Sequence, residues 1–323
     1  MMQSRRRFLS QSALAVSATA ISSLIPVGSI RAEGASTELN MLLGFSTYGA
    51  KKLTTEATIK LIAATGYDSV EITVWPDWDA APANMSRQRR NSLRKLLRDS
   101  GLKLTSLMEH VSPEQDESKH QASLERLKSV YQLANDLCPE SPPVVQTVLG
   151  GGEWDKKKTL FVDRVGDWTT LGKTSGIVTC VKPHRGGGMS RPSEAVWLIE
   201  QIGEARWLKM VYDFSHYAFR DIPLQESINK SLPHIGHVAV KDAVQTTSKD
   251  GKSRVEFRLP GEAGTIDFVT LLKTLQAGGY RGDISCEVSG MVWSKDGYDP
   301  VSAMKACYAN MSKAFHDSGI RRA

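Results

Sequence analysis

The sequence is poor in cysteine and lacks the usual glycine-rich nucleotide-binding motifs. Its 323 residues include four cysteines, which lie far apart and form no C-x-x-C pair. Cys180 and Cys286 lie in apolar runs, so buried free thiols are favoured over a disulfide framework. No G-x-G-x-x-G motif opens a helix after a strand, and no glycine run leads into the Lys-Ser/Thr of a P-loop. These absences argue against a dinucleotide-binding domain and a P-loop nucleotide site.

The first 32 residues contain no acidic residue, so they account for most of the net positive charge of the chain. The chain carries 41 basic and 35 acidic residues, a formal charge of +6. Without Arg5, Arg6, Arg7 and Arg31, the remaining chain has 37 basic residues against 35 acidic ones. Nucleic-acid binding usually needs a concentrated basic face, so a nucleic-acid partner is not expected.

The N-terminal segment reads as a targeting signal. Ser4-Arg5-Arg6-Arg7-Phe8-Leu9 precedes a weakly apolar stretch at 13–25, and Ala32 offers a small-residue cleavage point. The pattern resembles a bacterial twin-arginine export signal. An ordinary signal or an uncleaved anchor is the alternative. We predict that residues 1–32 address the folded chain to the twin-arginine machinery. The mature protein would then be periplasmic or otherwise extracytoplasmic, with no stable membrane span after cleavage.

The rest of the chain alternates between strand and helix patterns. Apolar runs typical of strands fall at 40–45, 69–74, 102–108, 144–149, 177–181, 208–212, 235–240 and 283–288. Helical patterns fall at 53–65, 86–100, 117–137, 159–173, 192–202, 224–232, 266–277 and 300–318, with a polar excursion at 245–258. Alternation of this kind implies parallel strands joined by right-handed crossovers. Eight units predict a single (β/α)8 TIM barrel over residues 39–319.

Chemistry in such a barrel gathers where the strands end. The fifth apolar run leads directly into Lys182-Pro183-His184-Arg185 and three glycines. Polar residues at or near the strand ends are Glu71, Glu109, His110, Lys182, His184, Arg185, Asp213, His216, His237, Lys241, Asp242 and Glu287. Converging carboxylates and imidazoles fit metal-assisted proton transfer on a small polar substrate. Each also has a structural interpretation, such as a helix cap for Asp213 or a hydrogen-bonded core histidine for His237.

Aromatic residues fall in the loops beside these candidates. They are Trp75, Trp78, Trp154, Phe214 and Tyr217. Aromatic rings next to carboxylates suit the apolar faces and the hydroxyl groups of a sugar.

Five short motifs in the C-terminal half carry a family resemblance. They are Asp213-Phe214-Ser215-His216, the segment 237–242, the segment 260–267, Gly279-Tyr280-Arg281-Gly282 and Cys286-Glu287. In this order they resemble a xylose isomerase-like TIM barrel. More narrowly, they resemble the sugar phosphate isomerase/epimerase group, whose relatives include ketose 3-epimerases and AP endonuclease family 2-like enzymes of the endonuclease IV type.

The resemblance implies one divalent metal (Mn, Zn, Co or Mg), held by Glu, Asp, His and Glu from strands five to eight. Carried over, the Asp is Asp213 and the last Glu is Glu287, while His216 matches a histidine beside the metal and substrate. Two positions depart from the pattern, because Lys182 replaces the strand-five Glu and Ala239 replaces the strand-seven His. A charged ammonium cannot ligate a metal and repels it.

Three interpretations of this departure stay open. In the first, the Lys182 ammonium takes the place of the metal charge, neutralises Asp213 and Glu287, and polarises a substrate oxygen. In the second, Lys182 is a base or a Schiff-base amine. In the third, a metal binds a shifted set, namely Asp213, Glu287 and His216, with His184 as a further ligand.

We therefore predict an exported isomerase or epimerase, or a lyase or hydratase on keto-sugars. It would transfer a proton next to a carbonyl of a small, unphosphorylated sugar. Glu287 is expected to be the acid/base and Asp213 its partner, with Lys182 and His216 stabilising the enolate. His184, Arg185, Lys241, Glu71, Glu109 and His237 are the expected substrate-binding residues. The rival prediction is a non-catalytic carbohydrate-binding barrel that has lost the family metal site. A nuclease is a distant third, and an oligomer is compatible with the sequence.

Overall fold

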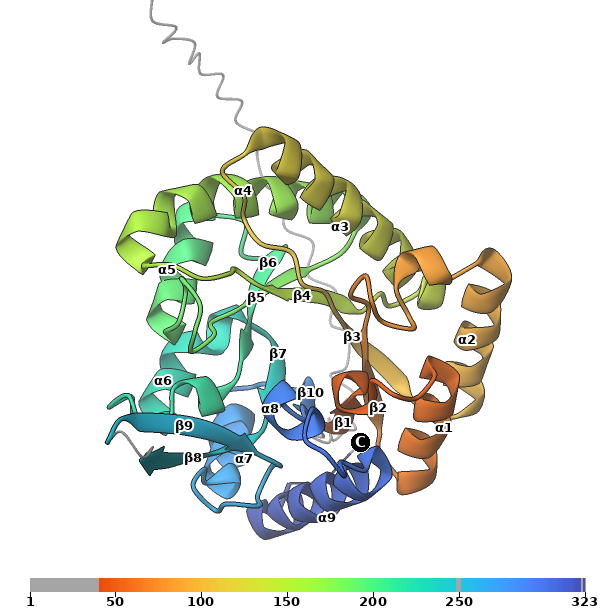
Figure 1. The fold of residues 1–323 in the computed structure, drawn as a ribbon, viewed down its shortest axis with the longest axis vertical. Coiled ribbons are helices and arrows are strands. Elements are labelled where there is room, and N and C mark those ends of the chain that lie inside the picture. The colour runs from red at the N-terminus through yellow and green to blue at the C-terminus, as the bar shows by residue number, and fades with distance from the viewer. Residues whose placement is uncertain (1–40, 248–250, 321, 323) are drawn as a thin grey trace, which may run out of the picture. The chain divides into compact units, whose positions relative to one another are not determined.

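Eight parallel strands close into a barrel, in the order β1-β10-β7-β6-β5-β4-β3-β2 (Figure 1). A computed structural model of the chain describes residues 41–247, 251–320 and 322. The barrel strands are β1 (Leu42–Ser46), β2 (Ser69–Thr73), β3 (Lys103–Met108), β4 (Val144–Val148), β5 (Thr179–Lys182), β6 (Leu208–Tyr212), β7 (Ile235–Val240) and β10 (Asp283–Cys286). The predicted (β/α)8 barrel is confirmed.

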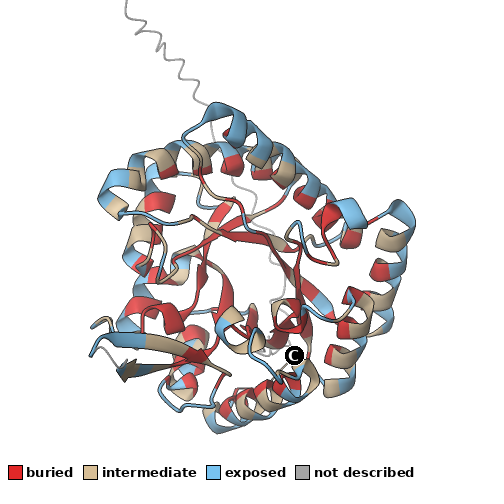
Figure 2. Ribbon diagram, in the orientation of Figure 1, coloured by how far each residue is buried: buried red, intermediate tan, exposed pale blue. Residues whose placement is uncertain are grey.

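Helices surround the barrel, with their buried faces toward the strands and their outer faces exposed (Figure 2). They are α1 (Thr55–Thr65), α2 (Arg87–Asp99), α3 (Glu117–Leu137), α4 (Trp154–Ser175), α5 (Pro192–Ile202), α6 (Leu224–Ser231), α7 (Phe268–Ala277) and α9 (Pro300–Ser318). Short helical turns are η1 (Thr47–Ala50), η2 (Pro82–Asn84), η3 (Phe214–His216), η4 (Leu232–His234) and α8 (Gly290–Trp293). Local signals set several of these ends: Ser86 caps α2, and Gly66 ends α1 at a φ of +99°.

Two boundaries differ from the sequence prediction in a way that matters for the site. Helix α4 begins at Trp154, five residues before the expected start, because its first turn is charged rather than apolar. Salt bridges from Lys156 to Glu153 and from Lys158 to Asp155 support that turn. Strand β10 ends at Cys286, so Glu287 is the first residue beyond the strand.

The polar excursion after β7 is an antiparallel hairpin. Its strands are β8 (Asp242–Thr247) and β9 (Ser253–Arg258), and Asp242 pairs with Arg258 at its base. The sequence prediction gave this segment no strands, because its side chains are mostly polar and show no alternation with a buried face. The hairpin matters because it brings Phe257 back to the end of β7.

Three further sequence predictions concern the cysteines, the export signal and membrane-spanning segments. All four cysteines are free, and three of them are buried. The predicted export signal lies outside the described residues. Within the described part of the chain, no helix combines the length and the apolar character that a bilayer crossing needs.

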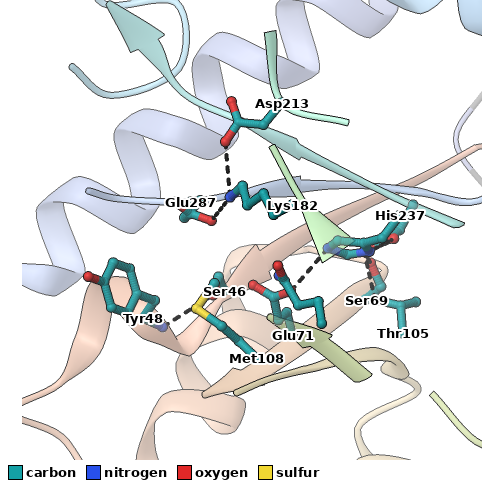
Figure 3. Close-up of polar contacts among 12 residues, drawn as sticks. Ser46, Tyr48, Ser69, Glu71, Thr105, Met108, Lys182, Asp213, His237 and Glu287 are labelled. Atoms are coloured by element: carbon teal, nitrogen blue, oxygen red, sulfur yellow. Dashed lines mark hydrogen bonds and ion pairs between the residues drawn. The ribbon is translucent and has the colours of Figure 1, made fainter. Parts of the chain in front are cut away.

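The interior of the barrel is polar below its mouth (Figure 3). His237 lies between two carboxylates, with its Nδ1 3.0 Å from Asp283 Oδ1 and its Nε2 3.1 Å from Glu71 Oε2. Thr105 donates to Asp283 at 2.7 Å, and Gln146 donates to Glu71. All three charged groups are at least 97% buried. Charges at that depth persist only when they are paired.

This pairing fixes the charge states of the network. Burial alone would lower the pKa of His237, but Asp283 and Glu71 raise it to about 10. Burial alone would raise the pKa of Glu71, but His237 lowers it to about 2. His237 is therefore an imidazolium at neutral pH. The pKa of His237 is higher in the folded protein than its unfolded value of 6.5, so its proton stabilises the fold. This stabilisation is complete below pH 6.5 and is lost as the pH rises toward 10.

Replacing His237 by Gln should lower the free energy of unfolding by about 3–5 kcal/mol near pH 6, because two buried carboxylates lose their cation. The deficit should shrink as pH rises toward about 10, since the wild-type imidazolium then loses its proton. Urea denaturation of both proteins across this pH range measures it. A deficit independent of pH would contradict the assigned charge state.

Candidate active site

Two lysines and two carboxylates meet at the barrel mouth, and we call them the ion cluster: Lys182, Asp213, Lys241 and Glu287. Lys182 Nζ lies 2.5 Å from Glu287 Oε2 and 3.0 Å from Asp213 Oδ2 (Figure 3). Lys241 Nζ lies 2.5 Å from Asp213 Oδ2 and 2.7 Å from Glu287 Oε1. Each ammonium thus contacts both carboxylates. The four residues come from the ends of β5, β6, β7 and β10.

The ion cluster is almost fully buried and has no net formal charge. None of its members is more than 6% exposed. Burial would lower the pKa of Lys182, but Glu287 and Asp213 raise it above its usual value. Burial would raise the pKa values of the two carboxyls, but the lysines hold the pKa of Asp213 well below its usual range and lower that of Glu287. Lys182, Asp213 and Glu287 are therefore charged around neutral pH.

Local hydrogen bonds hold the cluster in position. Asp213 caps η3, and its Oδ1 accepts from the Ser215 hydroxyl at 2.6 Å and from the Ser215 amide at 3.2 Å. Asp242, next to Lys241, accepts backbone N–H groups from Ala263 at 3.1 Å and Gly264 at 2.9 Å. The Asp213 carboxylate is thus fully engaged with protein groups, and the loop after β9 fixes the backbone that carries Lys241.

Two neutral histidines lie beside the cluster. The His184 and His216 rings are 4.2 Å apart between centroids. Burial, with smaller contributions from Lys241 and Lys182, lowers the pKa of His184 to about 4. Burial, with a smaller contribution from Lys241, lowers the pKa of His216 well below its usual value. Gly186 N–H points to His184 Nδ1 at 3.4 Å, and Arg185 N–H donates to His216 Nδ1 at 3.2 Å. A neutral ring whose Nδ1 accepts a hydrogen bond carries its proton on Nε2. Both rings therefore offer an Nε2–H donor.

A cavity of about 240 Å³ opens onto one side of the cluster. Its lining includes Lys182, His184 and Glu287, together with the aromatic side chains of Tyr48 and Trp75. On another side of the cluster, the Phe257 ring lies 5.1 Å from Lys241 Nζ and 5.1 Å from the His216 ring. The hairpin therefore covers Lys241 and His216, while Lys182 and Glu287 reach the cavity.

Of the other candidates at the strand ends, Glu109 and His110 line the cavity. Arg126 Nε donates to the Glu109 carboxylate at 2.8 Å. The Arg185 side chain donates to the carbonyl of Ala218 in the loop after η3. Glu71 and His237 lie below the cluster, in the barrel interior. The expected substrate-binding set is thus divided among the cavity wall, a neighbouring loop and the interior; its roles stay predictions.

Sequence reasoning missed part of the cavity wall. Tyr48, in η1 after β1, lies within 5.3–5.5 Å of the rings of Trp75, Trp78 and Trp293. The strand-end rule that identified the polar candidates could have found Tyr48, which lies two residues beyond β1. Trp154, expected in a loop by the site, instead packs on Trp197 of the helical layer at 5.4 Å.

The residues present do not fit the divalent metal implied by the family resemblance. The two carboxylates that would ligate it already share two ammonium groups, and ammonium nitrogens repel a divalent cation. Ala239 contributes no donor atom. Among residues 41–247, 251–320 and 322, no three His, Cys, Asp or Glu side chains are arranged to hold a metal ion.

Solved structures share this fold at low sequence identity. One is the IOLI protein with a bound zinc atom (TM-score 0.69, 14% identity, covering 86% of this chain and 99% of the other). Another is D-psicose 3-epimerase in the presence of D-fructose (TM-score 0.68, 13% identity, covering 86% and 100%). Identities this low establish the fold alone.

Curated relatives match over part of their length. Inosose dehydratase from Bacillus velezensis is 28% identical over 185 residues, which is 51% of this chain and 58% of the relative. The chain spans 38–58% of the length of the curated relatives it matches.

The model of the xylose isomerase-like TIM barrel matches residues 59–305. That range includes β2 to β10 and every member of the ion cluster. It begins after β1, so the loop that carries Tyr48 falls outside it. Because the match covers well over half of the sequence, the chain belongs to the xylose isomerase-like TIM barrel family.

Proposed function

We propose that this protein is an exported sugar isomerase or epimerase that moves a proton next to the carbonyl of a small, unphosphorylated sugar. The observation that carries the proposal is the placement of a carboxylate, an ammonium and a neutral imidazole in the lining of one sugar-sized cavity. Family membership supports it, since relatives with this fold include a D-psicose 3-epimerase and an inosose dehydratase.

Charge balance explains how the ion cluster would serve such a reaction. Glu287 would take the proton, the C–H electron pair would form the enolate double bond, and the negative charge would move to the substrate oxygen. That oxygen would accept a hydrogen bond from the Lys182 ammonium, which already lies 2.5 Å from Glu287. The negative charge thus moves from Glu287 to the substrate oxygen and stays beside the Lys182 ammonium. The net charge of the buried site does not change, so no large reorganisation is needed.

The remaining residues would have separate roles. His184 Nε2–H would donate to a second substrate oxygen, because the imidazole is neutral and lines the cavity. Asp213 and Lys241 are positioning residues, since the Asp213 carboxylate is engaged with protein donors and Lys241 is 2% exposed. Return of the proton from Glu287 to the neighbouring carbon, with the hydroxyl proton passing between the two substrate oxygens, would give an isomer. Delivery of a proton from water to the opposite face of the same carbon would give an epimer.

The unphosphorylated substrate is inferred from the predicted export, which would remove the enzyme from the cytoplasmic pool of sugar phosphates.

A second candidate is a carbohydrate-binding barrel without activity. The pairing of both cluster carboxylates with lysines favours it, because that pairing weakens Glu287 as a base. Turnover distinguishes the two functions.

Lys182→Met and Glu287→Gln should each lower solvent-deuterium exchange into an unphosphorylated ketohexose by about 100- to 1,000-fold, because each removes a group that acts on the transition state. NMR in D₂O, on a panel that includes D-fructose, measures the exchange. Lys305→Met, on the exposed face of α9, is the matched control and should retain full activity. Wild-type protein that binds the sugars but exchanges none of them would establish the binding-protein alternative.

Restoring the two departed family positions should create a metal site. The double variant Lys182→Glu, Ala239→His should bind Mn²⁺ in calorimetry, because it adds a carboxylate and an imidazole beside Asp213 and Glu287. The single variant Lys182→Glu should bind more weakly, and thermal unfolding of each variant checks that the barrel is intact. Equal Mn²⁺ affinity in the wild type and a folded double variant would refute the assignment of these positions.

The export signal can be tested by itself. Replacing Arg5 and Arg6 together by Lys should keep the precursor in the cytoplasm, because twin-arginine machinery requires the arginine pair. Cell fractionation and immunoblotting measure the distribution, with Arg31→Lys as the control. Unchanged export of the paired variant would show that another route carries the chain.

A further inference from the structure

A second, open groove adjoins the cavity beside the ion cluster. The groove has a volume of about 690 Å³ and runs over the loops after β2 and β3 toward α3. Trp75, Glu109 and His110 line both spaces. A ligand that extends from Lys182 and Glu287 beyond the cavity would therefore pass these residues to reach the groove.

The inner cavity is small for a complete extended ligand. Its volume of about 240 Å³ lies below the roughly 300–1,000 Å³ of pockets that enclose drug-sized molecules. A cavity of this volume has room for about one sugar ring. Any further ring attached to that sugar would have to lie outside the cavity, and the groove is the space that adjoins it.

Trp75 is held rigidly at the junction of the two spaces. Its ring centroid lies 5.3 Å from that of Tyr48, 6.0 Å from that of Trp78 and 4.8 Å from that of His110. Tyr48 is in turn packed against Trp293 at 5.5 Å. Packing of this kind fixes an aromatic face without ligand-induced ordering, which favours stacking against a sugar ring.

The junction also carries polar groups. Among the described residues, the buried indole N–H of Trp75 has no hydrogen-bond partner. Asp77, Glu114 and Arg126 line the groove beyond it, where Asp77 pairs with Lys51 and Arg126 with Glu109. An apolar ring face with an unpaired donor and nearby charged groups is the combination that recognises a carbohydrate.

We propose that the groove is a second sugar subsite, so that the substrate is a disaccharide whose ketose ring enters the inner cavity. This inference rests on the proposed function, because that function places the ketose against Lys182 and Glu287. It goes further in assigning the aromatic junction and the groove to a second ring, whose binding raises affinity without taking part in proton transfer.

The test compares D-fructose with maltulose and isomaltulose, which are fructose units carrying a glucose. Deuterium exchange next to the carbonyl gives kcat/KM for each, and quenching of tryptophan fluorescence gives binding. We expect kcat/KM for at least one disaccharide to exceed that for D-fructose by tenfold or more, which corresponds to about 1.4 kcal/mol.

Two serines of α3 provide a matched pair of variants. Ser123 lines the groove and Ser129 does not, yet each hydroxyl donates to the carbonyl four residues earlier. Ser123→Trp should fill the groove and bring the disaccharide-to-fructose ratio close to one. Ser129→Trp should leave the ratio as in the wild type.

Three results would count against the inference. Exchange of D-fructose with no advantage for either disaccharide would overturn the second subsite and leave the proposed function standing. A disaccharide advantage that survives in folded Ser123→Trp would do the same. Failure of the protein to bind or exchange all three sugars would overturn the proposed function, and the inference with it.

Discussion

The pairing of two ammonium groups with two carboxylates at the barrel mouth is the interaction on which the rest of the site depends. Lys182, Asp213, Lys241 and Glu287 come from four different strand ends, and each cation contacts both anions. Removing one partner would leave an uncompensated buried charge, at about 3–5 kcal/mol. The cluster therefore holds together the ends of β5, β6, β7 and β10 and sets the formal charge of the site.

The same pairing accounts for the chemistry we propose. In the metal-dependent pattern that the family resemblance implies, a divalent cation gathers the carboxylates. Here two monovalent ammonium groups supply an equal formal charge from within the chain. They also lower the pKa values of two neighbouring histidines, which leaves neutral donors at the site. The rings of Tyr48 and Trp75 line the same cavity as Lys182 and Glu287.

The sequence predicted the fold well because eight strand patterns alternate with eight helix patterns. It also identified all four cluster residues, since each lies at or just beyond a strand end. The pairing of Lys182 with Asp213 and Glu287 was one of the three interpretations of the departed metal site. The second ammonium was not expected, because the position of a residue at a strand end predicts which rim its side chain reaches and not which neighbour it contacts. Lys241 was expected to hold substrate, yet its ammonium lies on Asp213 and Glu287. Tyr48 was missed although it lies two residues beyond β1, because the candidates at the strand ends were limited to charged residues and histidines and Tyr48 was not paired with Trp293 of α8.

Metal content tests the central claim most directly. The mature protein would be purified without chelator, analysed for metals, and unfolded thermally with chelator or with excess Mn²⁺. Our account predicts far less than one metal ion per chain and the same Tm under all conditions, because the lysines already neutralise Asp213 and Glu287. One Mn, Zn, Co or Mg per chain, with a Tm that falls on chelation, would contradict it.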